Sequence, residues 1–82
     1  RAIDLWMGAI EKDPRVGLEY YRHVTAALAG QGRIDEARTY LAREKARVEA
    51  GAGDLTPEMR TKVLEALARC EAMAQSQRQN PP

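Results

Sequence analysis

The chain has 82 residues, of which 44% are hydrophobic and 30% charged, a composition that is ordinary for a soluble helical domain. Its length allows one small domain with a marginal core. The formal net charge of +1 argues against a nucleic-acid surface, because such a surface carries an excess of basic residues. The single cysteine, Cys70, excludes an intrachain disulfide and a cysteine-based metal site. No apolar run of about 18 residues is present, so no membrane insertion is expected.

Four helices are expected, and the first two cover about residues 2–12 and 16–29. In the first, apolar side chains recur at helical spacing: Ile3, Trp6, Met7 and Ile10. Asp13-Pro14 ends this helix, because proline disfavours helical geometry in the residue before it. The second helix has its own apolar stripe: Leu18, Tyr21, Val24, Thr25 and Leu28. It stops at Gly30-Gln31-Gly32, and so short a link predicts an antiparallel neighbour.

The third and fourth expected helices cover about residues 33–50 and 57–77. The inner stripe of the third is Ile34, Ala37, Leu41, Lys45 and Val48, with the Lys45 stem along apolar surface. In the fourth, Thr56 is suited to the N-cap and Pro57 to the first helical position. Its inner face is Met59, Val63, Ala66, Leu67, Cys70 and Met73. The pairs Glu58–Lys62 and Glu65–Arg69 are expected to stabilise it.

The fold class expected is therefore all-α. Residues 1–78 are expected to form a single domain and residues 79–82 a flexible tail. The chain starts without Met inside a helical pattern, so a fragment of a longer protein is expected. No catalytic constellation is found, and neither an enzyme nor a cofactor is expected. The carboxylates Asp35 and Glu36 at a helix start are explained by the helix dipole.

Two stretches of the chain share a pattern of small and bulky residues. The first is Ala2, Trp6, Ala9 and Asp13-Pro14, and the second is Gly32, Arg33, Ile34, Glu36, Ala37 and Leu41. Over about residues 1–48 this pattern resembles the tetratricopeptide repeat (TPR) family, with Tyr21 as the large aromatic of the next helix. The resemblance implies a right-handed stack of antiparallel helix pairs, a C-terminal capping helix and a concave groove. Three departures are an inserted residue before Tyr21, Glu44 in place of a small residue, and Glu49 in place of proline.

The resemblance also implies which side chains face the groove: Glu19, Arg22, His23, Ala26 and Ala29. These side chains either grip a peptide, with Arg22 as donor to a carboxylate or carbonyl, or form an ordinary solvated face. His23 is not expected to bind metal or act as a base, because no second histidine exists. Trp6 is interpreted as core rather than a binding platform. Cys70 is interpreted as core rather than a redox group.

The function expected is a non-enzymatic protein–protein interaction module that binds a peptide or partner helix in the groove. The alternative is a structural terminal cap of a longer repeat array that mediates self-association. A homodimer through the N-terminal helix end, with Leu5 and Trp6 exposed, belongs to this alternative. The compartment stays open between cytoplasm and periplasm.

Overall fold

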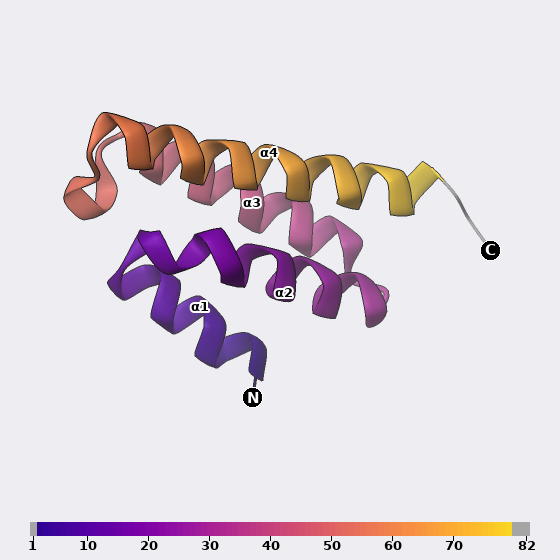
Figure 1. Ribbon diagram of the computed structural model, residues 1–82. Coiled ribbons are helices and arrows are strands. Elements are labelled where there is room, and N and C mark those ends of the chain that lie inside the picture. Colours follow the sequence, from indigo (N-terminus) through magenta and orange to yellow (C-terminus); the bar gives the residue numbers. More distant parts are fainter. Residues whose placement is uncertain (1, 80–82) are drawn as a thin grey trace.

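The structure is built from four α-helices joined by short connections. The computed structural model describes the backbone of residues 2–79 and the side chains of residues 2–76. The helices are α1 (Ala2–Lys12), α2 (Gly17–Gly30), α3 (Ile34–Glu49) and α4 (Pro57–Gln79), and two 3-10 turns are η1 (Pro14–Val16) and η2 (Ala52–Asp54). Residues 2–79 contain no strand (Figure 1). The predicted all-α class is confirmed.

The helix boundaries differ from the predicted ones by one or two residues. Residues Pro14–Val16 form a separate turn, so α2 begins at Gly17. The Asp13 carboxylate caps this turn by accepting the backbone N–H of Arg15 at 3.1 Å. At its C-terminal end α4 continues to Gln79, which is helical although it was predicted to begin the tail. The rest of that predicted tail lies outside the described residues.

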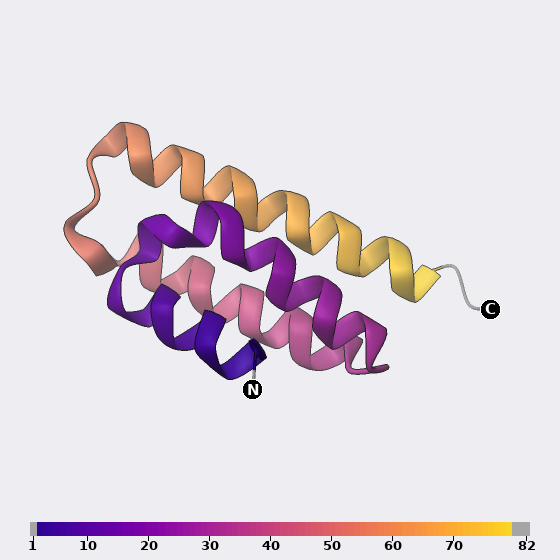
Figure 2. The same ribbon diagram turned by 60° about the horizontal axis from the view of Figure 1, so that its bottom comes forward.

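The helix α2 is central to the arrangement. It packs against α1, α3 and α4, and α3 and α4 also pack against each other. In both ribbon views α1 lies on the opposite side of α2 from α4, and α2 and α4 run in the same direction (Figures 1 and 2). The contacts of α2 with α1 and with α4 therefore lie on opposite sides of α2 (Figures 1 and 2).

The core forms where the predicted apolar stripes meet around α2. Its largest fully buried side chains include Ile10, Tyr21, Val24, Leu28, Leu41, Val48, Val63 and Leu67. Cys70 is also buried, in agreement with its interpretation as a core residue. Trp6 is half-buried and packs against the edge of this core.

Two members of the predicted stripes are wrong. Leu18 is 42% exposed and lines an open hollow between α2 and α4. Lys45 is exposed, and its neighbour Glu44 is buried in its place. The side of α3 that meets α2 continues from Leu41 by three residues rather than four, and the buried carboxylate finds hydrogen-bond donors there.

The links between helices use local hydrogen bonds that the sequence predicts. Gly32 has a φ of 74°, which glycine adopts without strain. The N–H of Arg33 then reaches the carbonyl of Leu28 at 2.8 Å, and the N–H of Gly32 reaches Ala29 at 3.0 Å. At the start of α4, the hydroxyl of Thr56 accepts the N–H of Met59 at 3.1 Å, as its predicted N-cap role requires.

The two ion pairs predicted within α4 do not form. Among the described side chains, the ion pairs are Arg15–Asp13, Arg33–Glu36 and Arg47–Glu44. Arg69 therefore has no carboxylate of its own helix within pairing distance. This leaves its guanidinium available on the surface of α4.

Candidate functional site

A groove follows the line where α2 and α4 lie beside each other. Its main part has a volume of about 370 Å³ and is lined by Gly17, Leu18, Glu19, Tyr21, Arg22, Ala66, Arg69, Cys70 and Met73. A smaller hollow of about 180 Å³ is lined by Thr25, Ala26, Ala29, Gly30 and Met73. Because Met73 lines both, the two hollows form one groove along α2. We call it the α2–α4 groove.

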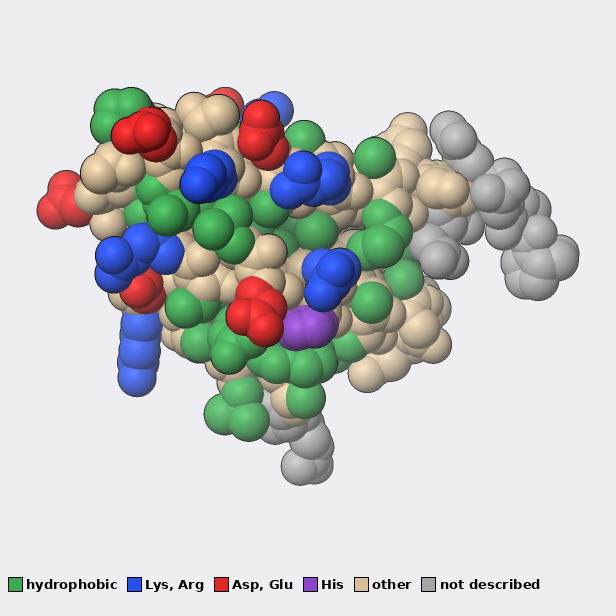
Figure 3. Space-filling view, viewed as in Figure 1, with side chains coloured by type: hydrophobic (Ala, Val, Ile, Leu, Met, Phe, Trp, Pro, Cys, Tyr) green, Lys and Arg blue, Asp and Glu red, His purple; other side chains and the backbone are tan. Residues whose placement is uncertain are grey.

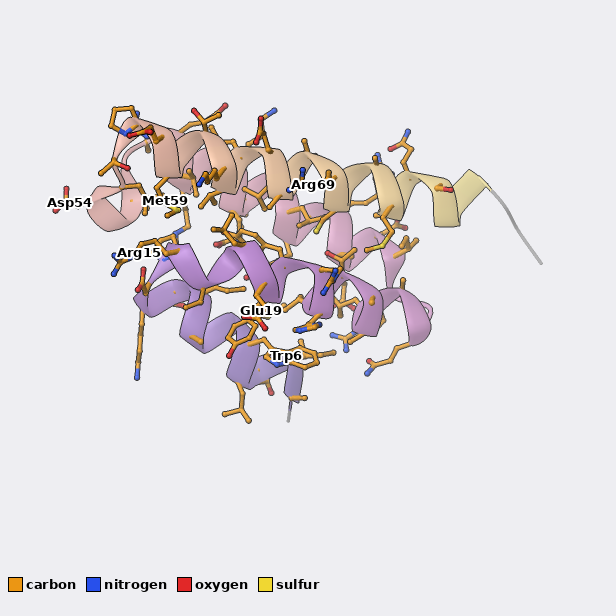
Figure 4. The ribbon with its side chains drawn as sticks, in the orientation of Figure 1. Trp6, Arg15, Glu19, Asp54, Met59 and Arg69 are labelled. Carbon is orange, nitrogen blue, oxygen red and sulfur yellow. The ribbon has the colours of Figure 1, made fainter. Side chains whose placement is uncertain are left out.

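The α2–α4 groove has an apolar floor and charged walls. Ala66 and Cys70 are buried at the floor, where their small side chains leave room between the helices. Arg22 on α2 and Arg69 on α4 are exposed. Figure 3 shows basic side chains above and below a band of hydrophobic ones, and Figure 4 places Glu19 on α2 and Arg69 on α4.

The pKa of the Cys70 thiol depends on the charges near the floor of the groove. Burial raises the pKa of Cys70, while the Thr25 hydroxyl and the guanidiniums of Arg22 and Arg69 oppose that shift. Both arginines therefore act on the same point between the helices. The raised pKa keeps the thiol protonated and unreactive, which agrees with a packing role.

The predicted groove residues separate into two sets. Glu19, Arg22, Ala26 and Ala29 line the α2–α4 groove. His23 does not line it. The His23 ring lies instead against Trp6 of α1, with ring centroids 5.3 Å apart, and against Tyr20, with centroids 6.0 Å apart. His23 thus belongs to the contact between α1 and α2.

A second hollow, of about 680 Å³, is lined mainly by α1 and α3: Met7, Glu11, Leu28, Asp35, Glu36, Thr39, Tyr40, Arg43, Glu44 and Arg47. The Tyr21 hydroxyl donates to Glu44 at 3.1 Å, and Nη1 of Arg47 donates to the same carboxylate at 2.7 Å. Burial raises the pKa of Tyr21 and of Tyr40, and the Glu44 carboxylate adds to both shifts. These polar groups hold α2 and α3 together.

The burial of Glu44 was not predicted from the sequence. The available signal was its position, where the TPR pattern has a small residue. Arg69 was not predicted to line the groove either, because it was expected to pair with Glu65. Glu44 has a hydrogen-bond partner on another helix, and Arg69 has no carboxylate partner among the described side chains. Neither fact can be read from the spacing of residues within one helix.

Within the described residues, no group of three or more histidine, cysteine, aspartate or glutamate side chains is placed to hold a metal ion. None of the helices in residues 2–79 combines the length and apolar character needed to cross a membrane.

Comparisons with known proteins found no match to any protein-family model, and no significant similarity to a curated protein or a solved structure. The function is therefore inferred from the residues of the α2–α4 groove.

Proposed function

We propose that this chain is a non-enzymatic protein-interaction module whose α2–α4 groove binds a peptide or a partner helix. The observation that carries the proposal is the set of residues on the groove. Side chains that the sequence marks on one face of α2, including Arg22 and Ala26, line a hollow with an apolar floor and charged walls. Such a surface suits a partner with apolar side chains between polar ones.

A TPR-like arrangement is part of the same proposal. It is supported by the antiparallel pair α2 and α3 and by α4, which packs against both as a capping helix does. In that arrangement α1 is the second helix of one unit, α2 and α3 form the next unit, and the groove side of α2 is the concave side. Repeat scaffolds of this kind commonly serve binding.

The groove is suited to binding because its walls are held before any partner arrives. Tyr21 anchors α2 to α3 through Glu44, and the Thr25 hydroxyl donates to the carbonyl of Tyr21 at 2.7 Å. Rigid helices lose little conformational entropy when a partner binds. Both a helix in a groove and an extended peptide are compatible with this mechanism.

The test is selection from a displayed library of random peptides, followed by titration of each selected peptide into isotope-labelled protein. We expect the amide signals of Ala26, Ala29 and Ala66 to shift. Ala26→Trp places a bulky side chain in the groove and should abolish binding. Ala46→Trp, at an exposed position of α3 outside the groove, is the matched control and should bind normally. Selected peptides that leave the groove signals unchanged would refute the proposal.

One observation favours the second function, a structural cap that self-associates through α1. Leu5 is 74% exposed on the outer side of α1, and a side chain at Gly8 would meet no atom within 4 Å. An open apolar position beside a small residue allows a second helix to approach closely. Sedimentation equilibrium distinguishes the two functions. If the wild type is a dimer and Leu5→Glu is a monomer, the structural cap is supported. If the wild type is a monomer that binds peptide, the interaction module is supported.

A further inference from the structure

We propose that the α2–α4 groove selects partners that carry an acidic side chain within their sequence rather than at a chain end. This side chain of the partner binds between Arg22 and Arg69. This inference rests on the proposed function and names the chemistry of the partner. It commits to the carboxylate of an aspartate or glutamate within an amphipathic segment.

Both guanidiniums lack a counterion among the described side chains. Neither Arg22 nor Arg69 takes part in an ion pair or hydrogen bond with any described side chain. Among the other described arginines, three are paired with carboxylates and three are not: Arg15, Arg33 and Arg47 are paired, and Arg38, Arg43 and Arg60 are not. Of the unpaired guanidiniums, those of Arg22 and Arg69 line the same groove.

The two guanidiniums approach the floor of the groove from opposite walls. Arg22 stands on α2 and Arg69 on α4, yet both guanidiniums act electrostatically on the thiol of Cys70 at the floor. An acidic side chain that enters above Cys70 therefore approaches both. Because the floor is apolar, the partner removes water from the groove, and an arginine–carboxylate contact gains strength as water leaves.

The charges that line the groove indicate how much negative charge a ligand should carry. Glu19 lines the same groove and has no ion-pair partner among the described side chains. With Arg22 and Arg69 it leaves the groove a net charge of +1. One carboxylate neutralises this charge, whereas a doubly charged phosphate group would leave one negative charge uncompensated beside Glu19. A phosphorylated partner is therefore disfavoured.

The experiment repeats the library selection with Arg22→Gln/Arg69→Gln and with the control Lys12→Gln/Lys45→Gln. The control removes the same charge from exposed positions on α1 and α3. We expect peptides selected on the wild type and on the control to carry an aspartate or glutamate at a fixed position. Peptides selected on Arg22→Gln/Arg69→Gln should lose this feature. Thermal unfolding of each variant verifies that the fold is intact.

Affinity measurements then use one selected peptide, acetylated and amidated so that it has no terminal charge. Replacing its acidic residue by the matching amide should weaken binding to the wild type by about fivefold or more, and to Arg22→Gln/Arg69→Gln hardly at all. The inference would be overturned if the acidic peptide and its amide counterpart bound the wild type with equal affinity. It would also be overturned if the difference between these two peptides persisted in Arg22→Gln/Arg69→Gln, or if a phosphoserine peptide bound the wild type more tightly than the acidic peptide. Groove-bound peptides without acidic residues would overturn it while the proposed function stands. If no selected peptide reaches the groove, both fail.

Discussion

The hydroxyl of Tyr21 donates a hydrogen bond of 3.1 Å to Oε1 of Glu44 and so connects α2 to α3 inside the core. Glu44 is only 3% exposed, and its other carboxylate oxygen accepts from Nη1 of Arg47 at 2.7 Å. A buried carboxylate is tolerated only when its oxygens have donors. The position of α2, and with it one wall of the α2–α4 groove, therefore depends on this contact.

The first prediction is that Tyr21 and Glu44 are energetically coupled. Tyr21→Phe should lower the free energy of unfolding by about 1 kcal/mol, because one hydrogen bond is lost. Glu44→Ala should cost about 2–4 kcal/mol, because the buried Tyr21 hydroxyl also loses its acceptor. Urea unfolding of both variants and of the double variant measures the coupling, which should be about 1 kcal/mol. Strict additivity would show that the bond contributes nothing.

The second prediction is that the fold loses stability at alkaline pH. Burial raises the pKa of Tyr21 and of Tyr40, and the Glu44 carboxylate adds to both shifts. Above about pH 10 the unfolded chain releases the phenol protons while the folded chain retains them. The free energy of unfolding should then fall by about 1.4 kcal/mol per pH unit for each buried tyrosine. Below this range the two phenols should cause no change.

Urea unfolding at a series of alkaline pH values measures this loss. Tyr21→Phe removes one of the two groups and should give a shallower decline than the wild type. Glu49→Gln, an exposed change on α3, is the control and should follow the wild type. Identical slopes for wild type and Tyr21→Phe would mean that the Tyr21 phenol ionises alike in both states.

Much of the fold could be predicted from helical spacing, because an apolar stripe marks the buried side of each helix. The error at Glu44 and Lys45 shows the limit of that signal. Residues three and four positions after Leu41 lie equally close to its face, and only the packing of α3 on α2 decides which is buried. A lysine with a long apolar stem is also the more usual choice for that position.

The candidate groove could be predicted only on the side of α2. Arg22 and Ala26 share one face of that helix, and the resemblance to the TPR family implies that this face lines a groove. The opposite wall depends on which turn of α4 lies beside α2, and periodicity carries no information on that. His23 follows Glu19 by one helical turn, yet the Trp6 ring of α1 lies against it. Trp6 lies on the preceding helix, and spacing within α2 does not show which side of α2 that helix covers.

The third prediction concerns the close contact of Gly17 with the ring of Tyr21. A Cβ atom at Gly17 would lie 2.3 Å from this fully buried ring, so Gly17→Ala should cost about 1–3 kcal/mol. Gly8 is helical and exposed, with no atom within 4 Å of an added Cβ. Gly8→Ala should therefore stabilise the protein by up to about 1 kcal/mol. Thermal unfolding of both variants provides the measurement, and equal effects would contradict the close packing at Gly17.

The fourth prediction separates His23 from the binding surface. His23 contacts Trp6 and Tyr20, so His23→Ala should lower the free energy of unfolding by about 0.5–1.5 kcal/mol. The fluorescence of Trp6, the only tryptophan, should change at the same time because its ring loses a neighbour. The affinity for a groove-binding peptide should stay at the wild-type value, whereas Arg22→Gln should reduce it. If His23→Ala weakens the peptide as much as Arg22→Gln and leaves the Trp6 fluorescence unchanged, then His23 acts on the partner and not on the packing of α1.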